Sequence, residues 1–274
     1  MNTYEKFNFL KNYLSSLDGL IVAFSGGVDS SFLLKVAFDV LGDKVLAVTA
    51  ISETFPQREL EKAKRFTQEY GIKHIVITTN ELSIEGFSKN PVNRCYLCKK
   101  ELFTKMFEVA KKNNITNIAE GSNYNDLDDY RPGLKAIEEL KILSPLRQAK
   151  LTKDEIRFLS KEIGLNTWNL PSFACLSSRF PYGEEITKEK IEMIDKAEQF
   201  LINMGFSQVR VRYHGNIGRI EVKPEEMAIL LNNDNCQKVY NYFKSLGFIY
   251  PVLDLKGYRT GSMNETLNLQ KQGL

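Results

Sequence analysis

A short segment near the N-terminus, Ser25-Gly26-Gly27-Val28-Asp29-Ser30, constrains the fold of this 274-residue chain more than any other. The apolar run from Leu20 to Phe24 precedes it and has the composition of a buried strand, and apolar residues return after it at helical spacing. Two successive glycines let the backbone turn sharply and approach a ligand closely. The free amides and the dipole at a helix start then suit an anion. The segment therefore predicts a strand, a phosphate-binding loop and a helix.

The side chains of this loop supply groups that a polyphosphate needs. Ser25 and Ser30 can donate to phosphate oxygens, and Asp29 is placed to bind Mg²⁺ beside a pyrophosphate. No Gly-Lys-Ser/Thr closes the loop, so it is not the Walker A pattern. An ordinary strand-to-helix turn is the alternative, which a lone Gly-Gly pair would favour. The full pattern instead favours ATP binding through Ser25, Gly26, Gly27, Asp29 and Ser30.

Strand and helix patterns alternate through the first part of the chain. Three further strands are expected at residues 44–50, 73–79 and 116–119. Helices are expected at residues 57–70, 98–113 and 152–163. Such alternation predicts an α/β fold with a parallel sheet flanked by helices. Ligands bind these sheets at the carboxyl ends of the strands, where the loop and residues 49–52 and 120–123 fall.

The composition changes near Pro181-Tyr182-Gly183. Residues beyond it read as helices, a hairpin and a last strand, which predicts a smaller α+β domain. We therefore expect an ATP-binding domain in residues 1–180 and a substrate and oligomerisation domain in residues 181–274. Arg210 and Arg212 share one face of a strand, and Glu221 falls across the hairpin. Such a face is either a solvated charged surface or a phosphate or carboxylate site.

Composition narrows the class of protein. Hydrophobic residues make up 43% and charged residues 26% of the chain, as is typical of globular proteins. No apolar stretch is long enough to predict a membrane span. Residues 4–17 form an amphipathic helical pattern instead of a signal peptide, so we expect a cytoplasmic protein. The net charge of +3 is too small to argue for nucleic acid binding.

Three cysteines have the pattern of a soft-metal site. Cys95 and Cys98 form a Cys-x-x-Cys pair, and Cys175 lies in a separate segment. In a reducing compartment such a pair favours a metal or redox site over a disulfide. A structural zinc would need a fourth ligand, for which the candidates are His74, His214 and Cys236. Three thiolates suit a 4Fe-4S cluster with one open iron, which we favour. A zinc site, a redox pair and an incidental spacing are the alternatives.

Several motifs together resemble a known enzyme family. The loop of residues 25–30, called the PP-loop below, resembles that of the N-type ATP pyrophosphatases, alongside the synthetases of NAD, GMP and asparagine. Motifs across almost the whole chain narrow the resemblance to the LarE family. These motifs are Gly121-Ser122-Asn123, Asp128-Asp129-Tyr130-Arg131-Pro132-Gly133, residues 171–179, residues 181–187, Arg210-Val211-Arg212 and residues 254–262. The resemblance implies a sheet of the adenine nucleotide α-hydrolase-like type.

The resemblance also implies a reaction. LarE enzymes are ATP-dependent sulfur transferases in the synthesis of the nickel-pincer nucleotide, the cofactor of lactate racemase. ATP would adenylate a carboxylate of pyridinium-3,5-dicarboxylic acid mononucleotide, and a sulfur nucleophile would then displace AMP to give a thiocarboxylate. In the one-cysteine branch the residue matching Cys175 gives up its own sulfur, whereas Cys95 and Cys98 match the cluster-bearing branch. A sulfide source and a homo-oligomer, often a hexamer, are implied as well.

Site residues follow from the same resemblance. Cys175 and Asp29 are expected to be catalytic, Asp29 also to bind Mg²⁺, and all three cysteines to bind the cluster. Around the substrate or its phosphate we expect Ser178, Arg179, Glu198, Arg210, Arg212 and Glu221. A transfer-RNA thiolation enzyme and a non-catalytic nucleotide or redox sensor are the alternatives. The absence of a concentrated basic stretch disfavours the first, and Asp29 with the other matched motifs disfavours the second.

Overall fold

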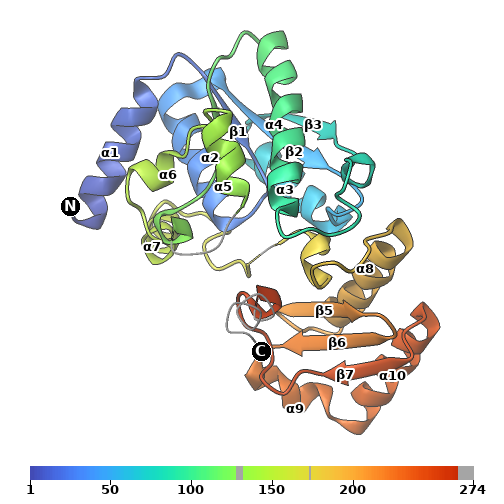
Figure 1. The fold of residues 1–274 in the computed structure, drawn as a ribbon. Coiled ribbons are helices and arrows are strands. Elements are labelled where there is room, and N and C mark those ends of the chain that lie inside the picture. The colour runs from blue at the N-terminus through green and yellow to red at the C-terminus, as the bar shows by residue number, and fades with distance from the viewer. Residues whose placement is uncertain (128–131, 173, 265–274) are drawn as a thin grey trace. The chain divides into compact units, whose positions relative to one another are not determined.

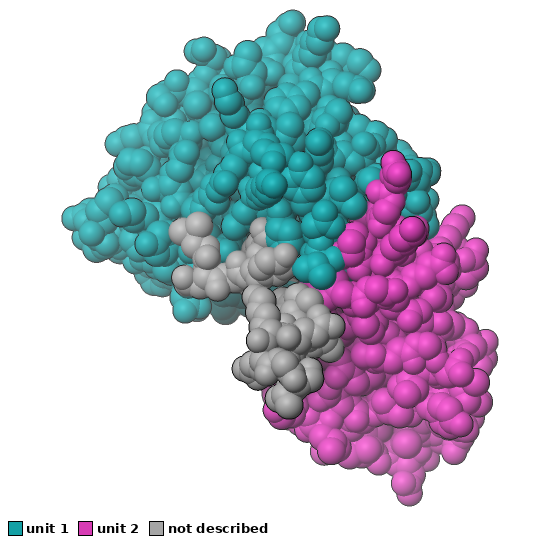
Figure 2. Space-filling model, in the orientation of Figure 1, with its two compact units in different colours: residues 1–84, 92–173 teal, residues 85–91, 174–274 magenta. Residues whose placement is uncertain are grey.

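The computed structural model describes residues 1–127, 132–172 and 174–264 and divides into two compact units (Figures 1 and 2). Unit 1 comprises residues 1–84 and 92–173, and unit 2 comprises residues 85–91 and 174–274. The expected division of function between residues 1–180 and 181–274 stays a prediction. Within the described residues, no helix has both the length and the apolar character needed to cross a membrane.

Unit 1 is built on a four-stranded parallel sheet with the strand order β3-β2-β1-β4. Its strands are β1 (Leu20–Ala23), β2 (Val45–Ile51), β3 (Lys73–Thr78) and β4 (Ile118–Ala119). Val22 lies beside Ala47 on one side and Ala119 on the other, so β1 is central. The predicted α/β fold with a parallel sheet is therefore confirmed.

Helices cover both faces of this sheet (Figure 1). They are α1 (Thr3–Ser15), α2 (Val28–Leu41), α3 (Gln57–Glu69), α4 (Arg94–Lys112), α5 (Gly133–Glu139), α6 (Pro145–Gln148) and α7 (Lys153–Glu162). Successive side chains of β1 point to opposite faces. Leu20 and Val22 pack with α1, α2, α3, α6 and α7 in one core cluster, whereas Ile21 packs with α4 and α5 in the other. The sheet therefore lies between two helical layers.

Two details of unit 1 differ from the sequence prediction. Helix α4 begins at Arg94, ahead of the expected start at Cys98, so both cysteines of the Cys-x-x-Cys pair lie in its first turns. Helices α5 and α6 were not predicted, because they have only 7 and 4 residues. Periodicity identifies helices mainly when they span three turns or more.

Unit 2 contains a three-stranded sheet with the order β5-β6-β7. Strands β5 (Val209–His214) and β6 (Ile217–Val222) form the predicted antiparallel hairpin, and β7 (Tyr250–Leu253) runs parallel to β6. The turn is tight, because only Gly215 and Asn216 separate the strands, and Gly215 has a φ of 61°. The helices of this unit are α8 (Lys188–Asn203), α9 (Met227–Leu230) and α10 (Asn233–Leu246).

Residues 85–91 belong to unit 2 although unit 1 surrounds them in the sequence. The Ile186 amide donates to the Ser88 carbonyl at 2.8 Å, and the Gly183 amide donates to the Asn90 carbonyl at 3.0 Å. The Asn90 side chain donates to the carbonyls of Phe180 and Pro181. This segment therefore anchors the turn at Pro181-Tyr182-Gly183, which no local sequence signal indicated.

Candidate active site

The PP-loop joins β1 to α2 as the sequence predicts. Gly26 has a φ of 74°, a left-handed conformation that favours glycine, and Gly27 caps α2 without a side-chain hydrogen bond. The hydroxyls of Ser25 and Ser30 lie 3.0 Å apart, and the Ser25 amide lies 3.3 Å from the Ser30 hydroxyl. The amides at the start of α2 and these two hydroxyls therefore form one donor-rich turn, as an anion requires.

Two glycines let neighbouring backbone reach this turn. A Cβ on Gly26 would lie 3.4 Å from the Ala63 amide nitrogen of α3. A Cβ on Gly121 would lie 3.1 Å from the Ser30 amide nitrogen and 3.2 Å from its Cα. The Gly121 position follows β4, so the carboxyl ends of β1 and β4 meet at the PP-loop, as expected for a nucleotide edge.

Asp29 lies in the first turn of α2 with one carboxylate oxygen paired and the other unused. Its Oδ2 forms an ion pair of 2.7 Å with Lys153 Nζ and lies 3.5 Å from Asn123 Nδ2. Its Oδ1 is buried and has no hydrogen-bond partner among the described residues. A carboxylate oxygen is a preferred ligand of Mg²⁺. The geometry therefore fits the expected cation, and it adds Lys153, which sequence reasoning missed because a lysine in a capped helix start is ordinary.

A second carboxylate, Glu120, ends β4 at the same edge of the sheet. Ser122 and Ser144 donate to its two oxygens at 2.6 and 2.7 Å, and Lys99 Nζ lies 3.6 Å away. Glu120 is buried, so these three groups replace water around its charge. Lys99 follows Cys98 on α4, so this cluster links the cysteine helix to the strand beside the PP-loop.

Cys95 and Cys98 lie three residues apart on α4 and so face the same side of the helix. Cys95 is exposed, and the Cys98 thiol donates to Glu81 Oε1 at 2.9 Å. Thr54 donates to the other carboxylate oxygen of Glu81. Glu81 follows β3 in the sequence, and its side chain is buried. Over the described ranges, no three His, Cys, Asp or Glu side chains are grouped as a metal site. Cys95 and Cys98 belong to unit 1 and Cys175 to unit 2.

The Cys175 segment of unit 2 is held by a buried ion pair. Arg179 Nε and Nη2 donate to the two oxygens of Glu198 at 2.8 and 3.0 Å, and both side chains are 1% exposed. Arg179 Nη1 donates to the carbonyls of Ala174 and Cys175. The amide and hydroxyl of Ser178 also donate to the Cys175 carbonyl, at 3.0 and 2.8 Å. Two charge-assisted hydrogen bonds from Arg179 and two neutral ones from Ser178 therefore fix the backbone at residues 174 and 175.

The electrostatics of this pair favour its charged form. Burial raises the pKa of Glu198, but the charge and hydrogen bonds of Arg179 outweigh burial and hold that pKa below its usual value. Burial lowers the pKa of Arg179, and Glu198 again reverses the direction. Burial, followed by the charge of Arg179, lowers the pKa of nearby Arg210 to about 10, which still leaves Arg210 charged at neutral pH.

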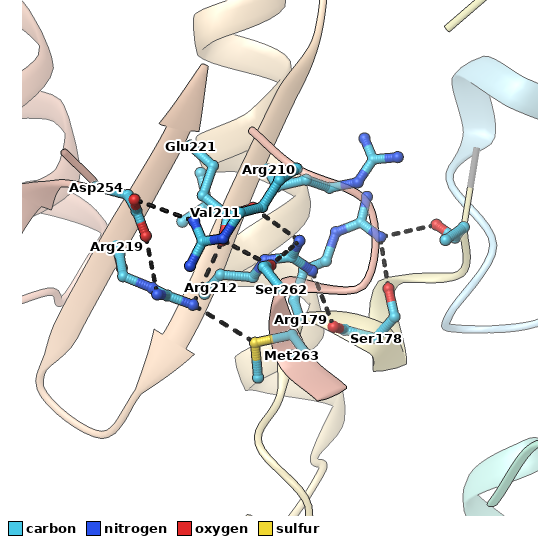
Figure 3. A network of polar contacts seen from close by, with 12 residues as sticks. Ser178, Arg179, Arg210, Val211, Arg212, Arg219, Glu221, Asp254, Ser262 and Met263 are labelled. Atoms are coloured by element: carbon cyan, nitrogen blue, oxygen red, sulfur yellow. Dashed lines mark hydrogen bonds and ion pairs between the residues drawn. The ribbon is translucent and has the colours of Figure 1, made fainter. Parts of the chain in front are cut away.

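Figure 3 shows a network of polar and charged side chains on β5, β6 and neighbouring segments. Arg210 lies opposite Glu221, as expected, and Arg212 forms a 2.7 Å ion pair with Glu221 and donates to Ser262 at 3.0 Å. Ser262 also donates to Glu221, at 2.9 Å. The Nε of Arg212 is buried and has no hydrogen-bond partner among the described residues. A buried guanidinium with a spare donor is suited to an anionic ligand.

The same network contains three charged residues to which the sequence analysis assigned no role. Arg219 pairs with Asp254 at 2.9 Å and with Glu221 at 3.3 Å, and Arg259 pairs with Asp254 at 3.2 Å. Arg219 lies opposite Arg212 in the hairpin, which could have indicated a shared face. Asp254 and Arg259 lie in the segment after β7. No pattern in the sequence predicts that this segment contacts the side chains of β6.

The structure thus assembles the predicted residues in three places. Ser25, Gly26, Gly27, Asp29 and Ser30 form the PP-loop, and Cys95 and Cys98 share a helix face. Within unit 2 lie Cys175, Ser178, Arg179, Glu198, Arg210, Arg212 and Glu221. The motif residues Asp128, Asp129, Tyr130, Arg131 and Phe173 lie outside the described residues. Cys236, one of the candidate fourth ligands of a zinc site, is exposed on α10.

Several known proteins are similar to this chain in sequence. The family model of NAD synthase matches residues 3–113, which include the PP-loop. An uncharacterized protein of Synechocystis is 41% identical over 96% of this chain and 98% of its own length. The pyridinium-3,5-bisthiocarboxylic acid mononucleotide synthase of Lactiplantibacillus plantarum is 41% identical over 93% of this chain and 92% of its own length. An uncharacterized protein of Methanocaldococcus jannaschii is 30% identical over 88% of this chain and 91% of its own length. The chain therefore belongs to the LarE family of ATP-dependent sulfur transferases with a PP-loop domain.

Proposed function

We propose that the chain converts carboxylates of pyridinium-3,5-dicarboxylic acid mononucleotide into thiocarboxylates, as a step in the synthesis of the nickel-pincer nucleotide. The observation that carries this proposal is the similarity to the Lactiplantibacillus plantarum synthase, which extends over 93% of the chain at 41% identity. The name of that enzyme specifies a bis-thiocarboxylic product. Two rounds of the same reaction, one for each carboxylate, would give it.

The PP-loop binds the polyphosphate of ATP in this proposal. The amides at the start of α2 and the hydroxyls of Ser25 and Ser30 donate to phosphate oxygens. The unpartnered Oδ1 of Asp29 would bind Mg²⁺, which neutralises phosphate charge when bound. Lys153, 2.7 Å from Asp29, can turn its ammonium group towards the same phosphates. These residues hold the α-phosphorus in line for attack.

Activation overcomes the poor reactivity of a carboxylate. A carboxylate oxygen of the substrate attacks the α-phosphorus, the bond from that phosphorus to the bridging oxygen breaks, and pyrophosphate leaves. The product is a mixed anhydride with AMP. A sulfur nucleophile then attacks the acyl carbon, the bond from carbon to the AMP oxygen breaks, and AMP leaves with that electron pair. The pre-organised donors of the PP-loop favour the first step, because negative charge develops there.

The cations of unit 2 would recognise the anionic groups of the substrate. Arg210 and Arg212 lie on one face of β5, and both are buried. Arg179 has a different task in this proposal, since its donors are directed to Glu198 and to the backbone at Cys175. Arg179, Ser178 and Glu198 therefore position Cys175, and Arg210 and Arg212 bind phosphate or carboxylate.

Sulfur would be carried by a 4Fe-4S cluster on Cys95, Cys98 and Cys175. Two of these thiols lie on one helix face, which fits the usual thiolate ligation of such clusters. An iron without a protein ligand would leave room for an exchangeable sulfide. The second route is the loss of sulfur from Cys175 itself, which would leave dehydroalanine and limit each chain to one transfer.

Iron and acid-labile sulfide per chain, measured after anaerobic reconstitution, test the sulfur carrier. The parent should contain about four irons, and Cys95→Ser, Cys98→Ser and Cys175→Ser should each lose them. Cys236→Ser is the matched control and should retain them, because Cys236 is exposed on α10 outside the set. An iron-free parent, with Cys175 lighter by the mass of H₂S after turnover, would favour the sacrificial route.

Pyrophosphate release tests the substrate class. It should depend on the pyridinium dicarboxylate mononucleotide and be accompanied by a thiocarboxylate product. Release that depends on transfer RNA would contradict the proposal in favour of RNA thiolation. ATP binding without release for either acceptor would indicate a sensor.

A further inference from the structure

A chain of hydrogen bonds crosses the sheet of unit 1 and ends at the carbonyl directly before the PP-loop. Thr49 Oγ1 donates to the Phe24 carbonyl at 2.7 Å, and His74 Nε2 lies 2.8 Å from Thr49 Oγ1. His74 Nδ1 lies 3.0 Å from the hydroxyl of Thr67 on α3. Phe24, Thr49 and Thr67 are each at most 2% exposed. The chain therefore runs through β2, β3 and α3, with both threonines shielded from water and the His74 ring half-buried between them.

The chemistry of Thr49 fixes the direction of the two hydrogen bonds that it makes. A hydroxyl has one proton to donate, and Thr49 directs it to the Phe24 carbonyl, so Thr49 accepts from His74. His74 Nε2 therefore carries a proton. The Thr67 hydroxyl lies 3.0 Å from His74 Nδ1 and 3.0 Å from the Lys64 carbonyl, so its one proton can serve either acceptor. Burial, with a smaller contribution from Lys64, lowers the pKa of His74 and favours a neutral ring, whose Nδ1 accepts.

A rigid peptide plane transmits this arrangement into the loop. In a trans peptide the carbonyl oxygen and the following N–H point in opposite directions. The bond from Thr49 holds the Phe24 carbonyl towards β2, so the Ser25 N–H points the other way, where it lies 3.3 Å from Ser30 Oγ. Ser30 lies in the first turn of α2, and its hydroxyl belongs to the PP-loop. Rotation of this peptide would turn the Ser25 N–H away from the position of an anion.

Packing supports the same position from a second side. The rings of His74 and Phe24 lie edge to face with centroids 5.9 Å apart, and Phe66 of α3 packs on Phe24 at 5.4 Å. Ala63, one turn before Thr67 on α3, approaches Gly26 of the loop. His74, α3 and the start of the PP-loop thus form one packed group.

We propose that Thr49 and His74 are positioning residues for the ATP site, which orient the Phe24–Ser25 peptide so that the Ser25 amide faces the polyphosphate. The inference rests on the proposed ATP-binding function of the PP-loop. Neither residue touches the nucleotide. Their effect is on affinity for pyrophosphate and ATP, because both ligands bind through the amide that the peptide plane directs.

Matched substitutions and two ligands test the proposal. Thr49→Val removes the hydroxyl but keeps the shape of a β-branched residue, and it should weaken the binding of magnesium pyrophosphate about three- to tenfold, the value of one hydrogen bond. Thr49→Ser keeps the hydroxyl and should bind within about twofold of the parent. His74→Phe should behave like Thr49→Val, whereas His74→Gln retains a donor for Thr49 and should restore affinity. Titration calorimetry with magnesium pyrophosphate and with magnesium ATP gives the dissociation constants.

A control separates positioning from stability. Thr79 is buried and its hydroxyl donates to the Ile51 carbonyl at 3.3 Å in the same sheet, outside the chain of bonds described above. Thr79→Val should lower the melting temperature as Thr49→Val does, yet leave pyrophosphate affinity unchanged. Equal melting shifts with unchanged affinity in both variants would overturn the inference while the ATP site stands. A parent that binds neither ligand would instead contradict the proposed function.

Discussion

Arg179 and Glu198 form a doubly hydrogen-bonded ion pair in which both side chains are 1% exposed. The pair connects the Cys175 segment to α8, because Glu198 lies on that helix and Arg179 also donates to the backbone at Cys175. Glu198 accepts a further bond from the Val211 amide of β5 at 2.9 Å. A single buried carboxylate thus joins the cysteine segment, the helix and the sheet of unit 2.

Loss of one partner of this pair should be costly. Arg179→Met should leave Glu198 charged, buried and without its main partner, and should lower the free energy of unfolding by about 3 to 5 kcal/mol. Urea unfolding, followed by circular dichroism, measures this change. Lys196→Met is the control, because its pair with Glu192 on the same helix is 60% and 53% exposed. That variant should change stability by less than about 1 kcal/mol. Equal effects of the two variants on the free energy of unfolding would contradict a stabilising role of the Arg179–Glu198 pair.

Asp29 should control magnesium-dependent ATP binding. Asp29→Asn removes the charge of the buried Oδ1 and weakens the ion pair with Lys153, so the affinity for magnesium ATP should fall by more than about tenfold. Asp39→Asn is the matched control on the same helix, since Asp39 pairs with Lys35 on an exposed surface. Calorimetry with and without Mg²⁺ measures both. If Asp29→Asn bound ATP as the parent does in Mg²⁺, the cation would have to be held elsewhere.

Gly121 should tolerate no side chain. A Cβ there would lie 3.1 and 3.2 Å from backbone atoms of Ser30, which cannot move without displacing the first turn of α2. Gly121→Ala should therefore weaken ATP binding as well as stability. Gly164→Ala provides the comparison, because that glycine has a φ of 75° and open space around it. It should cost about 1 to 2 kcal/mol of stability through backbone strain alone, with no loss of affinity. Similar ATP affinity of the Gly121→Ala and Gly164→Ala variants would show that α2 shifts to accommodate the added Cβ.

The parts of the fold that local patterns determine were predicted correctly. The apolar runs of β1 and β2 and the glycines of the PP-loop identified the parallel sheet and its ligand edge, because strand burial and left-handed turns impose strong local constraints. The opposition of Arg210 and Glu221 followed from the two-residue period of paired strands.

Contacts between distant segments could not be predicted in the same way. Lys153 reaches Asp29 over 124 residues of sequence, and Asp254 reaches Arg219 over 35 residues. The hydrogen bond between Cys98 and Glu81 and the anchoring of residues 85–91 in unit 2 are equally non-local. Such contacts depend on how elements pack, and no residue spacing encodes them. Sequence patterns therefore identified many of the site residues, but they did not predict the distant partners that orient those side chains.

The two histidines of the chain should make its stability depend on pH between about 5 and 7. Burial lowers the pKa of His74, and burial with Arg219 and Arg212 lowers that of His214, both from the usual value of 6.5. The folded chain therefore takes up protons less readily than the unfolded chain. As pH falls below 6.5, the unfolded state binds protons that the folded state does not, and stability is lost until the folded-state pKa values are reached. Melting temperatures at pH 7.5, 6.5 and 5.5 should fall in that order. His74→Gln and His214→Gln should each flatten this decline and together nearly remove it, while near pH 7.5 the His74→Gln variant should melt close to the parent because it retains a donor for Thr49. An equally steep decline in the double variant would assign the pH dependence to other groups.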